Sequence, residues 1–397
     1  MRVCMLAYAF YDDNARIQQY ATALTKRGDT VDVFALRRKG QAKNEVVNGV
    51  NVYRIQSRIV NEQSRIVYFL RVMRFLAYSA LLLTRRHISQ SYDLVHVHSV
   101  PDFLVFAALL PKLMGSTVIL DIHDILPEFY ASKFGANDRS LLFKLLVLVE
   151  KCSVAFSDHV IIANHLWYQR LIGRSAKPQK CTAICNYPNP QLFRVRPKQR
   201  TDGKFIITYP GTLNWHQGLD IAIKAFAKVA DQIPEAEFHI YGEGPSKPDL
   251  ISLANQLHLN GKVKFNEMMP IERIAEKMAN SDLAVVPKRA SSPFGNEAAS
   301  TKILEFMSSG VPVIVSRTKI DTYYHSDQTV KFFESENEGD LANCILLLRR
   351  DPELRSRLAA NAAKYAQENN WEAKKEQYLS LVDSLASADH NGVGNRS

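Results

Sequence analysis

Short apolar runs alternate with longer amphipathic segments along almost the whole of this 397-residue chain. Runs of this length, each followed by a helical pattern, predict the strands of parallel sheets covered by helices. The predicted strands are residues 3–7, 31–36, 94–97, 118–120 and 160–163 in the first half, and residues 205–209, 237–241, 263–265, 283–286 and 311–315 in the second. The sequence therefore predicts an α/β fold with two doubly wound domains.

Length and composition agree with two globular domains. At roughly 100 to 200 residues per domain, the chain is long enough for two separate cores. A charged content of 23% and a hydrophobic content of 46% exclude a disordered, collagenous or disulfide-scaffold protein. The five cysteines are an odd number and mostly lie in or beside apolar runs, so we expect reduced thiols and a cytoplasmic setting.

The boundary between the domains is predicted in a polar stretch that contains Pro188, Pro190 and Pro197. We expect an N-terminal domain, a C-terminal domain and a C-terminal segment over residues 1–195, 196–370 and 371–397. The helix of that segment is expected to pack back on the N-terminal domain. The tail from Ser387 is expected to be disordered, because it has no core-facing pattern. One linker between two doubly wound sheets would leave a cleft that faces the carboxyl ends of both.

Positive charge is concentrated in the first half of the chain. There are 50 Lys and Arg residues against 40 Asp and Glu, a formal net charge of +10, and the whole excess lies in that half. Residues 54–87, here called the basic stretch, contain the single acid Glu62. Their basic residues are Arg54, Arg58, Arg65, Arg71, Arg74, Arg85, Arg86 and His87. No DNA- or RNA-binding motif accompanies this charge, so no nucleic-acid partner is expected.

Part of the basic stretch is predicted to form a basic amphipathic helix. Arg71, Arg74, Tyr78 and Arg85 share one face of a helical projection, and apolar residues occupy the rest. Two interpretations stay open: an ordinary domain helix with a solvated arginine face, or a helix that docks on anionic lipid or a lipid-linked anionic substrate. A membrane-spanning helix is not expected, because Arg71 and Arg74 would be costly at a bilayer centre.

The most specific motif lies in residues 292–314, where Glu297 and Glu305 enclose seven residues. A helix that starts at Ser300 or Thr301 presents free backbone N–H groups and the positive end of its dipole, which suits phosphate. Glu305, about one turn into the helix, is placed to accept hydrogen bonds from ribose hydroxyls, and Glu297 reaches toward a sugar. The alternative is that both glutamates are only capping or surface residues.

This motif resembles the E-x7-E region of the retaining glycosyltransferases of family 4, the glycosyl transferases group 1. Residues 209–219 and 240–245 are similar to two glycine loops of that family, and residues 281–287 to the strand before the E-x7-E loop. The resemblance implies the GT-B fold, in which two Rossmann-like domains face each other across a cleft. It assigns a catalytic position beside the sugar to Glu297, and binding of a nucleotide-sugar donor to Gly211, Thr212, Gly242, Ile303 and Glu305.

The first glycine loop departs from the family pattern. Many members carry an Arg and a Lys for the donor diphosphate where this chain has Thr212 and Gln217. A diphosphate still requires positive charge or directed donors. We therefore expect Lys302 beside the helix start, or Lys288 and Arg289 after the preceding strand, to supply them. A solvated surface position stays open for each.

Two residues of the N-terminal half are assigned by the same resemblance. His123 follows the predicted strand 118–120, and the family keeps a histidine in such a place. Its implied catalytic role is to hydrogen-bond the donor sugar or to stabilise charge near the anomeric carbon; a loop histidine that caps the next helix is the alternative. Arg16 would meet donor phosphate or an anionic acceptor, unless it is a surface arginine. Asn14 is interpreted as a helix N-cap.

The resemblance implies transfer of a sugar with retention from a nucleotide sugar, most simply a UDP-sugar, to a glycan or polyprenyl-diphosphate-linked acceptor. Cell-surface polysaccharide or lipopolysaccharide biosynthesis is the expected setting. Such transfer needs no enzymic nucleophile, and no metal or other cofactor is expected. We expect a cytoplasmic enzyme bound peripherally to the inner face of the cell membrane, with the basic stretch against anionic lipid. A non-catalytic nucleotide-sugar-binding scaffold protein and a nucleotide-sugar 2-epimerase are the alternatives.

Overall fold

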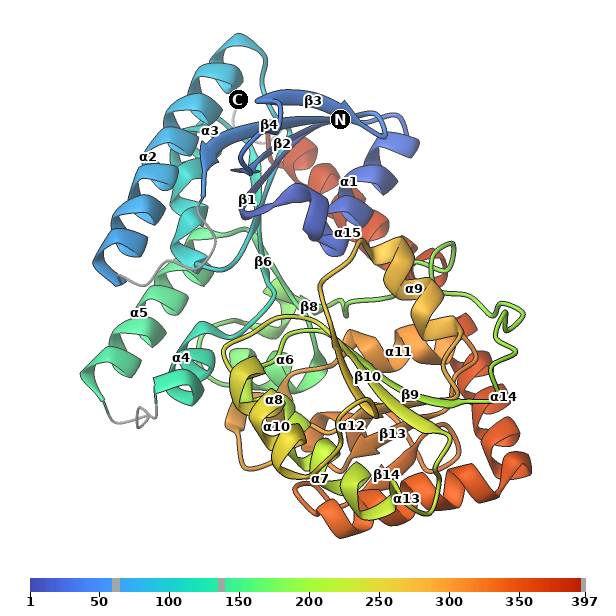
Figure 1. Cartoon of the computed structure of the whole chain (residues 1–397). Coiled ribbons are helices and arrows are strands. Elements are labelled where there is room, and N and C mark those ends of the chain that lie inside the picture. The colour runs from blue at the N-terminus through green and yellow to red at the C-terminus, as the bar shows by residue number, and fades with distance from the viewer. Residues whose placement is uncertain (59–64, 135–139, 394–397) are drawn as a thin grey trace. The chain divides into compact units, whose positions relative to one another are not determined.

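The computed structural model describes residues 1–58, 65–134 and 140–393, and it divides into two compact units (Figure 1). Unit 1 contains Met1–Asn186 and Lys375–Ser397, and unit 2 contains Tyr187–Lys374. The first division falls after Asn186, earlier than the expected residue 195. The reason is that Phe193 is 4% exposed and already packs in a core of unit 2.

Unit 1 is built on an eight-stranded sheet in the order β3-β4-β2-β1-β5-β6-β7-β8 (Figure 1). Its strands are β1 (Arg2–Phe10), β2 (Thr30–Arg37), β3 (Asn44–Val47), β4 (Val50–Ser57), β5 (Leu94–His98), β6 (Thr117–Ile122), β7 (His159–Ile162) and β8 (Cys181–Ala183). The sequence predicts β1, β2, β5, β6 and β7 as parallel strands, and the pairing confirms this. It missed β8 and the antiparallel β3–β4 hairpin, which turns through Asn48 and Gly49.

Helices connect the strands of unit 1. They are η1 (Tyr11–Asp13), α1 (Ala15–Lys26), α2 (Arg65–Ser89), η2 (Asp102–Ala108), α3 (Leu109–Leu113), α4 (Leu126–Phe134), α5 (Leu141–Phe156), α6 (His165–Ile172) and η3 (Pro178–Lys180). Asn14 caps α1 by accepting a hydrogen bond from the backbone N–H of Ile17 at 3.1 Å, which confirms its predicted role. This cap fixes the position of Arg16 in the first turn of α1.

Unit 2 is built on a six-stranded parallel sheet in the order β11-β10-β9-β12-β13-β14. Its strands are β9 (Phe205–Pro210), β10 (Ala236–Tyr241), β11 (Val263–Asn266), β12 (Leu283–Val286), β13 (Val313–Ser316) and β14 (Lys331–Phe333). Numbered within the unit, this is the order 3-2-1-4-5-6 of the Rossmann fold, whose ligands bind beyond the carboxyl ends of the strands. The sequence analysis predicted all of these strands except β14, which has three residues.

Helices cover both faces of the unit 2 sheet. They are η4 (Trp215–Gln217), α7 (Leu219–Val229), α8 (Lys247–Gln256), α9 (Ile271–Ala279), α10 (Pro293–Glu297), α11 (Thr301–Ser308), α12 (Lys319–Tyr324), α13 (Glu338–Arg350), α14 (Pro352–Glu368) and the start of α15 (Trp371–Val393). Val285 of β12 packs in one core with Phe226 of α7, and its neighbour Val286 in another with Phe306 of α11. The alternation of side chains along a strand thus gives the sheet two buried faces.

Most of α15 belongs to unit 1. Tyr378 is fully buried there, with its ring centroid 3.9 Å from that of Tyr20 of α1. The helix expected in the C-terminal segment is present as α15. However, α15 continues to Val393, where the sequence pattern predicted disorder from Ser387. A helix with a packed first part propagates without a core-facing pattern, because each further residue adds one backbone hydrogen bond.

Candidate functional site

Two glycine turns meet at the carboxyl edge of the unit 2 sheet. Gly211 follows β9 with φ +135°, and Gly242 follows β10 with φ +153°. The N–H of Gly211 donates to the carbonyl of Tyr241 at 2.8 Å. A β-carbon at Gly242 would lie 1.9 Å from the carbonyl oxygen of Gly211, so only glycine allows this approach. The predicted donor-binding residues Gly211 and Gly242 therefore form one surface.

Lys302, in the first turn of α11, lies over this glycine surface. A β-carbon at Gly211 would be 2.3 Å from Cε of Lys302, and the Lys302 Nζ is 5.4 Å from the ring centroid of Tyr209. The Lys302 ammonium group makes no hydrogen bond or ion pair with any residue that the structure describes. Burial lowers the pKa of Lys302 to about 8, although nearby Glu305 acts in the opposite direction. The ammonium group is thus a buried cation without an ion pair among the described residues.

The start of α11 presents further groups that suit an anion. The backbone N–H groups of Thr301 and Lys302 lack an intrahelical partner by their position in the helix. The hydroxyl of Ser300 is buried and has no hydrogen-bond partner among the described residues. Burial raises the pKa of Glu305 to about 7, with Lys302 opposing the shift. Lys302, Ser300 and Glu305 thus offer a cation, a hydroxyl and a carboxyl group at one helix terminus.

Lys288 and Arg289 are engaged by protein groups, and the phosphate contact expected for them stays a prediction. Lys288 is 2% exposed, and its Nζ lies 2.8 Å from Oδ2 of Asp321. Arg289 forms ion pairs with Asp220 and with Glu336, the latter at 3.0 Å. Both cations therefore hold the loop after β12 in place.

Three other positions have structural contacts. The carbonyl of exposed Thr212 and the Oε1 of Gln217 accept hydrogen bonds from the hydroxyl of Tyr209, at 3.1 and 3.0 Å. Gln217 therefore orders the glycine loop where many family members carry a cation. Ile303 is fully buried, and its N–H donates to the carbonyl of Ser300 at 3.3 Å. The predicted donor contact of Ile303 is accordingly not available to its side chain.

Glu297, at the end of α10, is 9% exposed and lies close to a lysine that the sequence analysis did not single out. The Nζ of Lys319 is 3.3 Å from Oε1 of Glu297. The backbone N–H of Lys319 donates to Oδ1 of Asn296 at 2.7 Å. Neighbouring side chains on α10 thus bind the start of α12, and this fixes Glu297 at the carboxyl edge of the sheet.

Arg16 is a buried ion-pair partner and not a surface arginine, and its contact with phosphate or an anionic acceptor stays a prediction. Its Nε and Nη2 lie 2.8 and 2.7 Å from the two carboxylate oxygens of Asp121 on β6. Its Nη1 donates to the carbonyl of Ile184 and to Oδ1 of Asn186, at 2.9 and 3.0 Å. Burial would lower the pKa of Arg16, but Asp121 raises it. The guanidinium group therefore anchors Asp121.

His123 and His98 meet on the carboxylate of Asp121. The Nε2 of His123 and the Nδ1 of His98 each lie 3.0 Å from its Oδ2, and the two nitrogens are 3.3 Å apart. Burial would raise the pKa of Asp121, but Arg16 and His123 hold it well below its usual value. Burial lowers the pKa of His98 to about 4, so His98 is neutral near pH 7. The side chain of His123 is 18% exposed, whereas His98 and Asp121 are buried.

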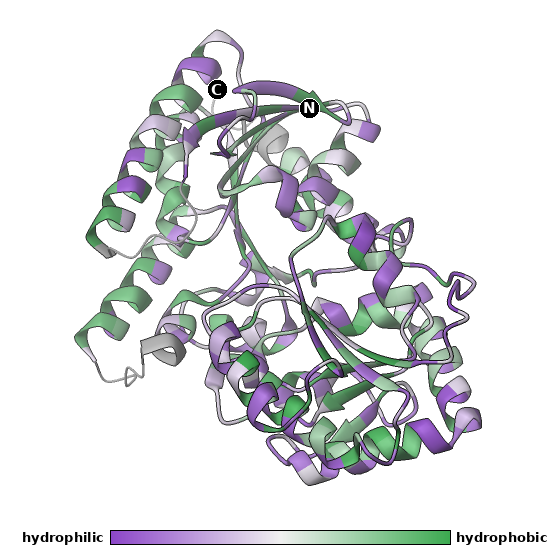
Figure 2. Ribbon diagram, in the orientation of Figure 1, coloured by the Kyte–Doolittle hydropathy of each residue, from purple (hydrophilic) through white to green (hydrophobic). Residues whose placement is uncertain are grey.

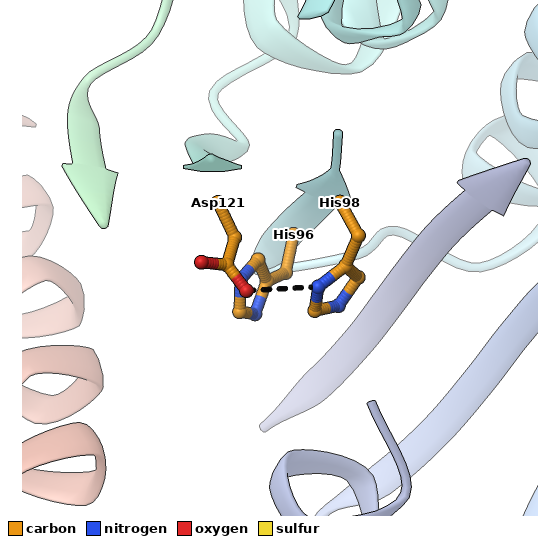
Figure 3. A group of neighbouring side chains, drawn as sticks. All are labelled: His96, His98 and Asp121. Atoms are coloured by element: carbon orange, nitrogen blue, oxygen red, sulfur yellow. Dashed lines mark hydrogen bonds and ion pairs between the residues drawn. The ribbon is translucent and has the colours of Figure 1, made fainter. Parts of the chain in front are cut away.

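A second histidine of β5 lies behind this contact. His96 and His98 are two residues apart and lie beside Asp121 of β6, as Figure 3 shows. The Nδ1 of His96 is 3.0 Å from the hydroxyl of Tyr378 of α15. Burial and then His98 hold the pKa of His96 well below its usual value. The exposed edge of His123 is thus supported by neutral imidazoles and one ion pair.

His96, His98 and Asp121 also have ligand atoms within 4.8 Å of one another, a spacing compatible with a metal ion. However, both oxygens of Asp121 already accept hydrogen bonds from Arg16. A metal cation would have to bind beside this fixed positive charge, which is electrostatically unfavourable. The residues therefore fit a hydrogen-bonded network better than a metal centre, and the absence of a metal cofactor stays a prediction.

The basic stretch divides into buried and exposed parts. Arg54 is 4% exposed and ion-paired to Asp12 at 3.1 Å. His87 is 3% exposed, and its Nδ1 accepts from the backbone N–H of Tyr92 at 3.1 Å. Neither residue is available to a lipid headgroup, which corrects the prediction for these two positions. Arg74 and Arg85 of α2 are exposed.

Among the described residues, one segment, Ile66–Ser89 of α2, is long and apolar enough to cross a membrane by length and composition. Only 22% of its most apolar window is buried. Glu62, the single acid of the basic stretch, lies outside the described residues.

Two family models together match almost the whole chain, one in each half. Residues 193–365 match the model of the glycosyl transferases group 1, and residues 14–187 match a glycosyl transferase 4-like domain. The chain belongs to the glycosyl transferases group 1. The matched segments correspond to units 2 and 1, so the predicted family is confirmed for both parts of this glycosyltransferase.

Known proteins agree with this assignment. The glycosyltransferase is 24% identical to the sulfoquinovosyl transferase of Arabidopsis thaliana over 314 residues, which span 73% of this chain and 57% of the plant protein. Sucrose-phosphate synthase from Thermosynechococcus elongatus has a similar structure, with a TM-score of 0.80, 19% identity and coverage of 98% and 100% of the two chains. HepE of Anabaena in complex with UDP-glucose has a TM-score of 0.74 and 18% identity, with coverage of 97% of this chain and 100% of that chain. These structures confirm the GT-B fold.

Three residues that lie beside candidate site residues were not predicted from the sequence, namely Lys319 and His216 in unit 2 and His98 in unit 1. Lys319 follows β13 in the sequence, as His123 follows its predicted strand, so it too is expected at the carboxyl edge of a sheet. His216, between the first glycine loop and α7, has a pKa lowered to about 4 by burial and then by Lys302. His98 also carries a sequence signal, because it directly follows the predicted strand 94–97, as His123 follows the predicted strand 118–120.

Proposed function

We propose that this glycosyltransferase transfers a sugar, with retention of configuration, from a nucleotide sugar to a glycan or polyprenyl-diphosphate-linked acceptor. A UDP-sugar is the simplest donor, and cell-surface polysaccharide or lipopolysaccharide biosynthesis the proposed setting. The observation that carries the proposal is Lys302, whose ammonium group lies over Gly211 without an ion pair among the described residues. The UDP-glucose complex of the similar Anabaena protein supports the donor class.

The donor diphosphate is proposed to bind between Lys302 and the start of α11. There it gains a positive charge, unpaired backbone N–H groups and the buried hydroxyl of Ser300. Gly211 and Gly242 allow the backbone to approach it closely. The Glu305 carboxylate accepts hydrogen bonds from the ribose hydroxyls. One lysine of α11 thus replaces the two cations that many family members carry on the first glycine loop.

In the proposed reaction, the bond between the anomeric carbon and the diphosphate oxygen breaks. The acceptor oxygen bonds to the same carbon on the same face, and its proton passes to the departing diphosphate. Negative charge increases on that diphosphate as the bond breaks, so Lys302 and the α11 amides stabilise the transition state more than the bound donor. This step requires no enzymic nucleophile, metal or other cofactor.

His123 and Glu297 are the proposed catalytic residues beside the sugar. Asp121 holds the Nε2 of His123 at 3.0 Å, so the ring orientation is set before the donor binds. Lys319 holds one oxygen of Glu297 at 3.3 Å, and the carboxylate can accept hydrogen bonds from sugar hydroxyls. A fixed orientation of both groups lowers the entropic cost of reaching the reactive geometry.

We also propose that the enzyme is cytoplasmic and binds peripherally to the inner face of the cell membrane. Exposed Arg74 and Arg85 of α2 support it, because clustered arginines beside apolar surface attract anionic lipid.

Transfer of radiolabelled sugar into a bacterial lipid extract tests the function. We expect labelled product whose anomeric configuration, read by NMR, matches that of the donor. Lys302→Ala should reduce product about tenfold to a hundredfold; its control is Lys228→Ala, a half-exposed lysine of α7. Donor binding without transfer would favour the scaffold alternative, and conversion of the donor without acceptor would favour the epimerase.

A further inference from the structure

Helix α5 carries a highly apolar sequence in unit 1 and buries little of it. Its residues 141–149 read LLFKLLVLV, and none of them is buried. Leu141, Leu145 and Leu148 are 86%, 55% and 55% exposed. The buried side chains of this helix, which include Glu150 and Val154, lie in its second half. An apolar surface of this kind marks an interaction site, because isolated soluble domains rarely expose one.

A second exposed apolar group continues this surface. Leu109, Leu110 and Leu113 of α3 are 50%, 48% and 74% exposed. The preceding helix η2 packs against both α2 and α5, and its Phe106 contacts Phe156 of α5 with ring centroids 5.2 Å apart. The exposed apolar side chains of α3 and α5 therefore belong to one connected layer of unit 1.

Helix α2 extends the layer. It packs on the unit through Val72, Phe75 and Leu83, which are at most 2% exposed. Its opposite side exposes further apolar residues, namely Ile66, Phe69, Leu70, Leu81 and Ile88. Figure 2 shows long hydrophobic stretches along α2 and α5. The helix is thus apolar on both its inner and its outer face, unlike an ordinary surface helix.

The charged residues of this layer indicate which kind of partner binds it. Exposed cations stand among the apolar side chains: Arg74, Arg85, Lys144 and Lys151. Among the described residues of α2, η2, α3 and α5, the acids are Asp102 and Glu150, each 1% exposed. Glu150 is also ion-paired to Arg174 at 2.6 Å. A second copy of this face would meet like charge, whereas an anionic lipid surface complements both its charge and its apolar character.

We propose that α3 and α5 join α2 in one docking face for an anionic lipid bilayer. The apolar side chains enter the boundary of the acyl chains, while Lys144, Lys151, Arg74 and Arg85 stay at the level of the phosphates. This proposal rests on the proposed peripheral membrane binding and extends it to elements outside the basic stretch. It makes α5 an essential part of the membrane contact.

Flotation of the full-length protein with vesicles tests the proposal. The vesicles contain phosphatidylcholine alone or with phosphatidylglycerol. The triple variant Leu141→Gln, Leu145→Gln, Leu148→Gln should bind phosphatidylglycerol vesicles at least about tenfold more weakly than the wild type, because three inserted leucines are lost. Its matched control exchanges the exposed apolar residues Ile251, Met268 and Leu347 of unit 2 for Gln, and should bind as the wild type does.

A variant that changes only charged residues tests lipid docking without altering the leucines. Lys144→Glu with Lys151→Glu should remove most of the preference for phosphatidylglycerol. Both variants should keep the wild-type melting temperature and the wild-type affinity for nucleotide sugar measured without vesicles. That affinity tests the donor site separately, so failure of the docking proposal and failure of the proposed catalysis are distinguishable.

Three results would overturn the proposal. In the first, the leucine variant binds vesicles like the wild type while Arg74→Glu with Arg85→Glu loses binding, which would confine the contact to α2. In the second, the wild type is a dimer without lipid and the leucine variant a monomer, so a second copy covers the face. In the third, alkaline carbonate fails to release the wild type from vesicles, which would show a membrane-spanning α2.

Discussion

The side chain of Lys302 crosses Gly211 so closely that a β-carbon at Gly211 would lie 2.3 Å from Lys302 Cε. The glycine loop after β9 and the first turn of α11 therefore form one surface, although 90 residues separate them in the sequence. The position of the ammonium group depends on the missing side chain of Gly211. Substitution of this glycine should thus affect the donor site through displacement of Lys302.

Gly211→Ala should weaken binding of the nucleotide-sugar donor by about tenfold or more, because the methyl group displaces Lys302 from the glycine surface. The measurement is a calorimetric titration with the donor. Gly261→Ala is the matched control: this glycine also has a positive φ, +82°, but nothing lies within 4 Å of its added β-carbon. The control should lose about 1 kcal/mol of stability and keep its donor affinity. Equal donor affinity in both variants would contradict the role of Lys302.

Donor affinity should be highest between about pH 7 and 8. The Glu305 carboxyl, with its pKa raised by burial to about 7, is ionised above that pH. The Lys302 ammonium, with its pKa lowered by burial to about 8, is charged below that pH. Affinity should fall toward acid as Glu305 is protonated and toward alkali as Lys302 is neutralised. Titrations across this range should show that Glu305→Gln loses the acidic limb and keeps the alkaline one.

Asp121→Asn should destabilise unit 1 by about 3 to 5 kcal/mol, because the guanidinium group of Arg16 would stay buried without a counter-charge. Urea unfolding, followed by circular dichroism, measures the loss. The control is Asp13→Asn, whose ion pair with Arg38 is solvent-exposed and should contribute less than about 1 kcal/mol. A similar loss in both variants would mean that the pair between Arg16 and Asp121 has no special structural role.

Stability should decrease on acidification between pH 6.5 and about 4, in part through His98. The native pKa of this histidine is lowered by burial to about 4, and the unfolded value is about 6.5. In this window the unfolded state binds the additional proton, so stability falls with pH by at most about 1.4 kcal/mol per unit. Above pH 6.5 both states are neutral and the contribution is constant.

His98→Asn tests this pH dependence, because the amide keeps a donor near the position of Nδ1 and does not titrate. Urea midpoints at pH 7, 6 and 5 should show a smaller decrease for the variant than for the wild type. Parallel curves for the two proteins would assign the acid sensitivity to other groups.

The fold was largely predictable from the sequence, and the missed elements share a physical cause. Strands such as β1 and β12 are buried on both faces, so they appear as continuous apolar runs. Strand β3 is mostly exposed and carries Asn44 and Glu45, so no apolar run marks it. Its signal was the Asn48-Gly49 pair, a dipeptide typical of tight hairpin turns, whose positive φ angles of 50° and 81° the structure confirms.

Candidate site residues were predictable where their place in a helix or loop is itself evident from the sequence. Lys302 and Glu305 were selected because they lie in the first turns of a helix that follows a loop, and the structure places them there. Arg16 was assigned to phosphate by the family resemblance and Lys288 because a diphosphate requires positive charge, and neither argument shows the partners that these residues have in the fold. Arg16 pairs with Asp121 across 105 positions, and Lys288 with Asp321. Such long-range ion pairs depend on the tertiary fold, which local patterns do not reveal.

Release of nucleoside diphosphate from UDP-, GDP- and dTDP-sugars, with and without bacterial lipid extract, tests the central claim most directly. The wild type should release diphosphate from one donor, and the extract should accelerate this release. Glu305→Ala should reduce it about tenfold to a hundredfold, through loss of the proposed hydrogen bonds to the ribose. No release from any donor, or equal release by wild type and Glu305→Ala, would contradict glycosyl transfer from a nucleotide sugar bound at the start of α11.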